Sequence, residues 1–94
     1  MWKLKENAGG LSKDENAKSI ADKISRLRGI TPGILALEIG VDLNKGAQAY
    51  DLVLYSEFES MDALNLYQNH PDHAKARDFI LEVTSDRRVV DYEI

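Results

Sequence analysis

Two neighbouring segments of the chain alternate apolar and polar residues with a period of two, and this pattern limits the possible folds more than any other feature. A period of two is that of a β-strand, whose successive side chains point to opposite faces. A polar loop, residues 44–48, contains Gly46 and separates the segments. The two segments therefore predict an antiparallel hairpin. The apolar residues that alternate in the first strand are Leu35, Leu37, Ile39, Val41 and Leu43.

The second predicted strand is partly apolar on both of its faces. Tyr50, Leu52, Leu54 and Phe58 share one face, whereas Val53 and Tyr55 lie on the other. Helices that cover one face of an antiparallel sheet leave the opposite face in water, where polar residues are usual. An apolar second face therefore predicts that something besides the helices of one protomer covers it.

The residues after the first glycine pair predict a helix. Ser12 and Glu15 are spaced as in a capping box, in which each side chain accepts from the backbone N–H of the other residue. Gly29 is the residue type that commonly follows the last turn of a helix. Between them lies one apolar stripe at helical spacing, made of Ala17, Ile20, Ala21, Ile24 and Leu27.

Two further helices are predicted on either side of Pro71. Ser60 is a suitable N-cap for the second helix. Pro71 ends that helix, because the residue before a proline avoids the α region, and it also suits the first position of a third helix. The third helix carries His73, Ala76, Phe79, Ile80 and Val83 at helical spacing.

The two ends of the chain predict strands over residues 1–5 and 88–94, and residues 6–10 predict a polar turn that ends on Gly10. The predicted order is therefore β-α-β-β-α-α-β. This order is that of the α+β class with a ferredoxin-like arrangement, a four-stranded antiparallel sheet with helices on one face.

Composition bounds the class of protein. A chain of 94 residues makes a single domain, residues 1–94. The apolar fraction of 44% and charged fraction of 30% are ordinary for a soluble globular protein. The chain has no cysteine, no apolar run long enough to span a bilayer and no signal-peptide core, so we expect a cytoplasmic protein that binds no membrane. The net charge of −4, without a basic stripe, argues against nucleic acid as a partner.

Several short runs resemble the stress-responsive A/B barrel (Dabb) domain family over nearly the whole chain. The most specific run is Tyr67-Gln68-Asn69-His70-Pro71-Asp72-His73. Weaker ones are Lys3-Leu4-Lys5, Pro32-Gly33-Ile34, Tyr50-Asp51-Leu52-Val53-Leu54, Phe58-Glu59-Ser60 and Val89-Val90-Asp91-Tyr92-Glu93. The resemblance implies a ferredoxin-like protomer that pairs face to face with a second copy, giving a homodimeric α/β barrel.

The resemblance also implies candidate catalytic residues. In a plant polyketide cyclase of the family, the tyrosine and the second histidine of the motif carry catalysis, and they match Tyr67 and His73. Related barrels include cofactor-free monooxygenases that oxidise polyaromatic substrates.

The chain departs from the family in two places. Only Met1 and Trp2 precede the first matching run, so the usual first-strand histidine is missing. Leu52 stands where the cyclase has a third-strand histidine. The cyclase reaction itself is therefore not expected.

The two histidines allow both functional and structural interpretations. His73 is a candidate general base, since the unperturbed pKa of imidazole lies near neutrality. Alternatively, His73 packs on the apolar face of its helix with one nitrogen bonded to the backbone, while His70 caps the helix break. A metal site is not expected, because Pro71 interrupts the His-x-x-His spacing and no third ligand is indicated. No cofactor is expected either, since Gly9-Gly10 lacks the glycine pattern that cradles phosphate.

Four aromatic residues are candidates for a ligand-binding cavity: Trp2, Tyr55, Phe79 and Tyr92. They could line a barrel suited to a planar apolar molecule, or they could serve as core and dimer contacts. Three hypotheses for function stay open. The chain binds a small apolar or aromatic molecule in the dimer barrel, or it is a small cofactor-independent enzyme, cyclase-like or monooxygenase-like, that uses Tyr67 and His73, or it is a purely structural oligomer.

Overall fold

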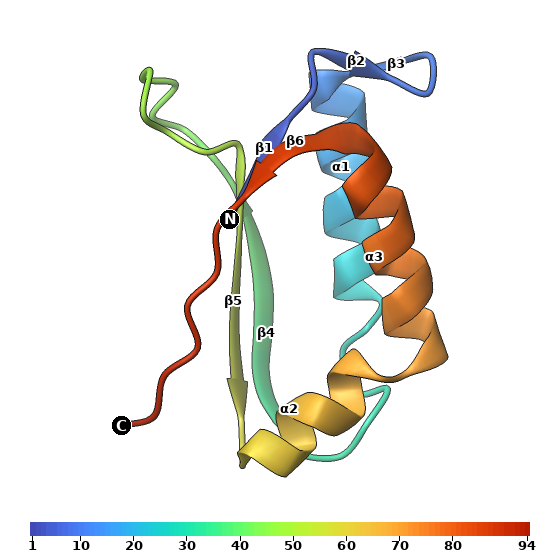
Figure 1. Cartoon of the computed structure of the whole chain (residues 1–94), viewed down its shortest axis with the longest axis vertical. Helices are drawn as coiled ribbons and strands as arrows, with labels where there is room; N and C mark the ends of the chain where they lie inside the picture. Colours follow the sequence, from blue (N-terminus) through green and yellow to red (C-terminus); the bar gives the residue numbers. More distant parts are fainter.

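The two alternating segments form the longest pair of strands in the sheet. In the computed structural model, which describes residues 1–94, β4 (Ile34–Val41) pairs antiparallel with β5 (Leu52–Phe58). Two short strands complete the sheet, β1 (Trp2–Leu4) and β6 (Thr84–Arg87), in the order β4-β5-β1-β6 with every pair antiparallel. The chain therefore has the predicted ferredoxin-like fold, with three helices on one face of a four-stranded antiparallel sheet (Figure 1).

The predicted alternation from Leu35 to Leu43 is wrong at both of its ends. The β4–β5 register shifts between Ile34 and Ala36, and this bulge leaves the Leu35 side chain 63% exposed. A bulge inserts one residue that has no partner opposite, so the pattern slips there by one position. Leu43 lies beyond the end of β4 and is 93% exposed. Between these ends Leu37 is buried, as the alternation predicts.

In β5 the two faces are as predicted, except that Tyr50 precedes the strand. Leu52 is buried and Leu54 half-buried beneath the helices, whereas Val53 and Tyr55 point to the opposite face and are 45% and 46% exposed. The Tyr50 hydroxyl instead donates to Asp86 Oδ2 on β6 at 2.6 Å. The sheet therefore has an inner face toward the helices and an outer face with exposed apolar side chains.

The capping signals at the helix N-termini are confirmed, but the first helix ends at Ser25 with Arg26 as its C-cap, earlier than Gly29 predicts. α1 spans Lys13–Ser25, and Ser12 Oγ accepts from the Glu15 N–H at 3.2 Å while Glu15 Oε1 accepts from the Ser12 N–H at 3.3 Å. α2 spans Met61–Gln68, and Ser60 Oγ accepts from the Ala63 N–H. α3 spans Pro71–Val83 and has Pro71 in its first turn.

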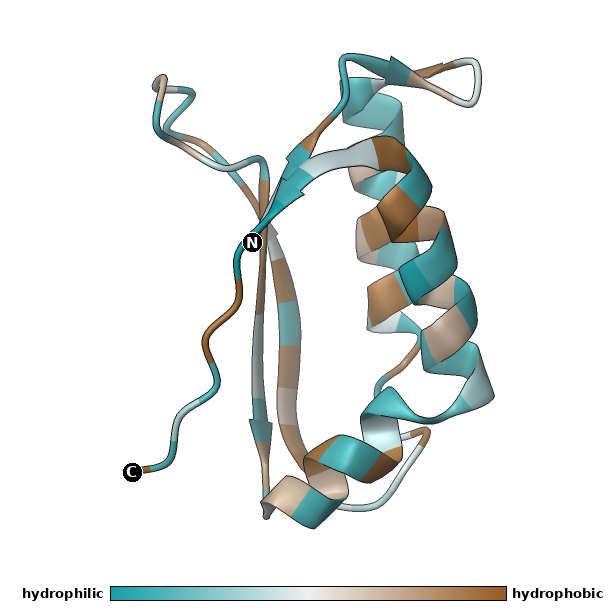
Figure 2. Ribbon diagram, viewed as in Figure 1, coloured by the Kyte–Doolittle hydropathy of each residue, from teal (hydrophilic) through white to brown (hydrophobic).

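The core lies between α1, α3 and the inner face of the sheet, and Figure 2 shows apolar residues along both helices and in the strands. Leu27 follows the last turn of α1 but is still buried, as its place in the predicted stripe requires. The buried apolar residues are Trp2, Leu4, Ala17, Ile20, Ile24, Leu27, Leu37, Leu52, Tyr67, Ala76, Ile80 and Val83.

The predicted final strand over residues 88–94 is wrong, because the last strand is β6 (Thr84–Arg87). Arg88 N donates to Met1 O at 2.9 Å, and the N-terminal ammonium donates to Arg88 O at 2.9 Å. Residues 89–94 continue beyond the Met1–Arg88 pair. They make no backbone hydrogen bond, because no strand lies beside them. They run on the side of the sheet away from the helices (Figure 1).

The predicted turn over residues 6–10 is part of a small hairpin that the pattern did not indicate. β2 (Asn7–Ala8) pairs with β3 (Leu11–Ser12), and Gly9 and Gly10 form the turn with φ of +60° and +79°. Asn16, which is 1% exposed, donates from Nδ2 to Ala8 O at 3.1 Å and fixes the hairpin on α1. Strands of two residues are too short for an alternation to be recognised.

Gly33 sets the distance between the start of β4 and α2. Its φ is +87°, and a Cβ built there would lie 2.7 Å from the Ala63 Cβ. We expect Gly33→Ala to lower the free energy of unfolding by more than about 2 kcal/mol, since strain at positive φ adds to a steric overlap. Chemical denaturation measures this change.

The matched control is Gly29→Ala, because Gly29 also has a positive φ, +74°, but has open space around its Cβ position. It should cost only the strain, about 1 kcal/mol. Adding Ala63→Gly should recover part of the loss at Gly33 and none at Gly29. Equal losses for the two alanine variants would contradict the close approach of β4 and α2.

Candidate functional site

Tyr67 and His73, the residues of the motif Tyr-x-x-His-Pro-x-His, lie in contact. Their ring centroids are 4.8 Å apart and the ring planes meet at 66°, an edge-to-face arrangement. Tyr67 lies in the last turn of α2 and His73 in the first turn of α3. On its other side Tyr67 packs against Phe58, with the centroids 5.3 Å apart. The pair therefore lies on the helix side of the sheet, within one protomer.

The short break between α2 and α3 brings the two rings together. His70 is the N-cap of α3, and its Nδ1 accepts from the Asp72 N–H at 3.1 Å. Pro71 follows in the first turn, where its missing N–H costs no helical hydrogen bond. His70 therefore has the capping role that the structural interpretation predicted, and α3 begins at an angle to α2, with His73 facing Tyr67 (Figure 1).

Burial controls the protonation of both rings. Tyr67 is 3% exposed, and burial raises the pKa of its hydroxyl to about 12, so the phenol keeps its proton. Burial also lowers the pKa of His73 below its usual 6.5. The nearby Arg77 and Arg87 charges lower that pKa further, and the Gln68 backbone opposes them. At neutral pH the site holds a neutral imidazole beside a protonated phenol.

His73 carries a nitrogen without a partner. Its Nδ1 is buried and makes no hydrogen bond, and Thr31 Oγ1 is the other buried side-chain atom in this state. The Gln68 backbone is near enough to raise the pKa of His73, but the geometry does not make a hydrogen bond to Nδ1. An unpaired buried polar atom costs about 1–3 kcal/mol, and such atoms are uncommon enough to require an explanation.

The four aromatic candidates do not line one cavity. Trp2 is 8% exposed and belongs to the core opposite Leu52, and Phe79 lies on α3 with the Lys23 ammonium 4.7 Å from its ring centroid. Tyr55 lies on the outer face of β5 and Tyr92 in the segment after β6, 74% exposed. Trp2 and Phe79 are therefore on the helix side, and Tyr55 is on the opposite side.

A polar hollow that the sequence did not indicate lies elsewhere, at the loop between β4 and β5. It has a volume of about 250 Å³. Two of its three lysines have partners, since Lys13 pairs with Glu6 and Asp51, and Lys3 Nζ donates to Ala49 O. No three His, Cys, Asp or Glu side chains are grouped so as to hold a metal ion.

None of the three helices is both long enough and apolar enough to cross a bilayer.

Comparison with known proteins decides the family. The model of the stress responsive A/B barrel domain matches residues 1–94. The chain belongs to this family. A search of curated proteins gives no match. The Tyr67–His73 contact is thus a feature of an A/B barrel domain protein.

Two solved structures resemble this A/B barrel protein. One is a dimeric protein of unknown function with a ferredoxin-like fold from Bacteroides fragilis NCTC 9343, 29% identical, with a TM-score of 0.82 over 99% of this chain and 89% of that one. The other is a dimeric ferredoxin-like protein of unknown function from Thermobifida fusca YX, 23% identical, with a TM-score of 0.84 over 100% of this chain and 85% of that one.

The lowered pKa of His73 predicts how stability changes with pH. The unfolded chain takes up the His73 proton near pH 6.5, before the folded chain does, so the free energy of unfolding should fall as the pH decreases below 6.5 and stay unaffected above it. His73→Gln should remove this part of the pH dependence. Urea denaturation of both proteins between pH 5 and 8 measures it, roughly the range in which histidine titrates. Identical pH profiles for the two proteins would contradict the burial of a neutral imidazole.

Proposed function

We propose that this A/B barrel domain protein forms a homodimer through the outer face of its sheet and binds a small apolar or aromatic molecule at the Tyr67–His73 pair. The observation that carries the ligand proposal is the unpartnered Nδ1 of His73 at the edge of an aromatic ring. A ligand with one hydrogen-bonding group and a flat apolar body would satisfy the nitrogen and pack against Tyr67.

The proposed dimer rests on the outer face. Leu35, Val53 and Tyr55 keep between 45% and 63% of their surface exposed on a face that no helix covers. Exposed apolar side chains on one face of a sheet are typical of a contact with another protein. Both similar solved proteins are dimeric, and this supports a second copy of the chain as the partner.

A catalytic role is the second candidate, because the protonation states suit it. A neutral imidazole can accept a proton from a substrate, and a phenol that stays protonated can donate a hydrogen bond to an oxygen that gains charge. Tyr67 and His73 would then act together on an aromatic or polyketide-like substrate. Leu52, which is 1% exposed and faces the core, supplies no third polar group, so this pair is the whole candidate machinery.

The dimer is tested by changing one outer-face residue. We expect the wild-type protein to scatter light as twice its chain mass of 10.6 kDa. Val53→Lys should shift the mass toward the monomer, since it buries like charges against each other across the interface. Leu81→Lys is the control, because Leu81 is 56% exposed on α3, away from the outer face, and should leave the dimer intact. A wild-type mass of 10.6 kDa would contradict the dimer.

Ligand binding is tested by thermal shift with small aromatic compounds. A compound at 100 times its Kd adds about 2.7 kcal/mol of stability, which should be visible as a higher Tm. His73→Ala should lower the free energy of unfolding by no more than about 2 kcal/mol and abolish the ligand-dependent rise. His70→Asn keeps an N-cap and should retain the rise. A rise that survives in the His73 variant would place binding elsewhere.

A further inference from the structure

Where β1 begins, the stretches of chain on either side of it continue without a neighbour. β5 pairs with β1 only at Leu52, opposite Trp2, and its residues 53–58 have register partners on β4 alone. On the other side of β1, residues 89–94 make no backbone hydrogen bond. One edge of β5 and the segment after β6 are therefore both open.

The two open stretches run alongside each other. β5 and β6 are both antiparallel to β1, so they are parallel to one another and continue past the start of β1 in the same direction (Figure 1). Trp2 is opposite Leu52 on one side and opposite Arg87 on the other, which sets the two stretches level with each other. Two strands that flank a third lie about 9–10 Å apart, because adjacent strands are about 4.7–4.9 Å apart. We call the interval between residues 53–58 and 89–94 the strand gap.

The strand gap offers backbone hydrogen bonds on both of its sides. A strand placed there pairs with β5 on one side and with residues 89–94 on the other. The edge of β4 that faces away from β5 is also open, but it offers a partner on one side only. Open strand edges are sites of β-strand addition, in which an extended peptide joins the sheet. The strand gap is therefore the stronger of the two sites for such a peptide.

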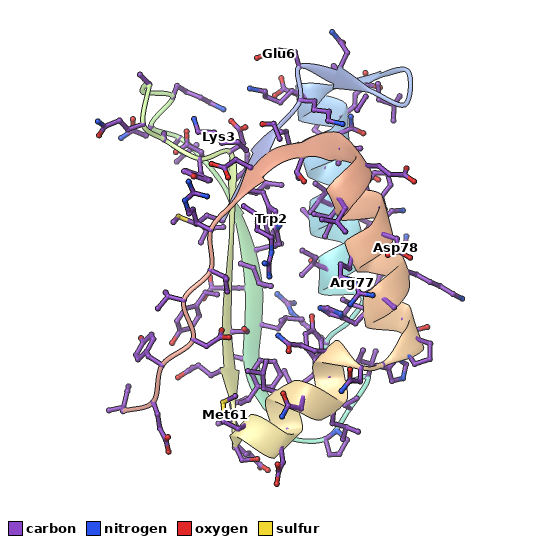
Figure 3. The ribbon with its side chains drawn as sticks, viewed as in Figure 1. Trp2, Lys3, Glu6, Met61, Arg77 and Asp78 are labelled. Atoms are coloured by element: carbon purple, nitrogen blue, oxygen red, sulfur yellow. The ribbon has the colours of Figure 1, made fainter.

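The end of the strand gap beside β1 is apolar. Leu54 is half-buried on the helix side, and Val89, which is level with it, is 63% exposed. Figure 3 shows Trp2 on the helix side of the sheet, in line with the strand gap. Side chains alternate along a strand, so an inserted strand turns every second residue toward the helices. Apolar residues suit those positions.

The far end of the strand gap is acidic. Glu57, Asp91 and Glu93 are exposed and take part in no ion pair or side-chain hydrogen bond. Neither residues 53–58 nor residues 89–94 contain a lysine or an arginine. Opposite charges on neighbouring strands stabilise a sheet, and like charges destabilise it. A strand that fits the strand gap therefore carries basic residues at this end.

We propose that the strand gap binds an extended peptide segment of another protein, basic in its N-terminal half and apolar on the helix side of its C-terminal half. The peptide runs antiparallel to β5, in the direction of β1, because antiparallel pairs are the more stable. Its basic half then lies beside Glu57 and Asp91, and its apolar residues lie beside Leu54. This contact is separate from the Tyr67–His73 pair and does not depend on the ligand proposed there.

The test uses an acetylated and amidated peptide, Lys-Thr-Lys-Val-Thr-Val, and calorimetry on the full chain. The matched peptide Glu-Thr-Glu-Val-Thr-Val should bind about tenfold more weakly, since like charges replace favourable cross-strand pairs. The peptide Lys-Pro-Lys-Pro-Thr-Val should not bind, because proline removes backbone donors from the ladder. No binding of the first peptide, or equal binding of all three, would overturn the proposal.

A charge change at one residue separates the strand gap from the overall negative charge of the chain. Glu57→Lys should weaken the lysine peptide about tenfold and strengthen the glutamate peptide. Glu82→Lys is the matched control, because Glu82 is exposed on α3 and its substitution changes the net charge equally. It should change the binding of neither peptide. Equal effects of the two variants would show that binding follows net charge alone and would overturn the proposal.

Amide hydrogen exchange locates the bound peptide. The amides of residues 89–94 make no backbone hydrogen bond, so they should exchange fast in the free protein and slowly with the lysine peptide. Protection that appears in β4 instead would place the peptide at the outer edge of the sheet, against the proposal. Slow exchange at residues 89–94 before any peptide is added would show that a second copy of this chain fills the strand gap, and would also overturn it.

Discussion

The break between α2 and α3 is the constraint on which the rest of the structure depends. Pro71 prevents one continuous helix, and the His70 side chain caps the new one, so the chain changes direction there and α3 packs beside α1 on the sheet (Figure 1). This change of direction places Tyr67 against His73. It also brings the end of α3 to the start of β6, which returns to pair with β1. The same local feature therefore builds the site and closes the sheet.

The two faces of the sheet then have different roles. The inner face is buried by α1 and α3, and the Tyr67–His73 pair lies on this side, where α2 meets α3. The outer face keeps Val53 and Tyr55 exposed, and the apolar segment after β6 runs on that side. We infer that association uses the outer face and ligand chemistry the inner one. On this account the ligand lies within each protomer and not between the two paired sheets, where the sequence alone had led us to expect it.

Much of the fold could be predicted from the sequence, because the deciding signals are local. The capping box at Ser12, the N-cap at Ser60 and the proline at position 71 each act through neighbouring residues. The failures come from pairing between distant residues. The bulge at Leu35 and the position of the last strand depend on which residues lie opposite, and for residues 89–94 the alternation is real but no neighbouring strand exists. The motif marked Tyr67 and His73, but their ring contact depends on the angle between α2 and α3, which no local signal gives.

The location of the bound ligand tests the central claim most directly. A crystal structure of the protein with an aromatic compound that raises its Tm should show the ring on the helix side of the sheet against Tyr67, near Nδ1 of His73. Density for the ligand between the outer faces of two copies, beside Val53 and Tyr55, would contradict the account.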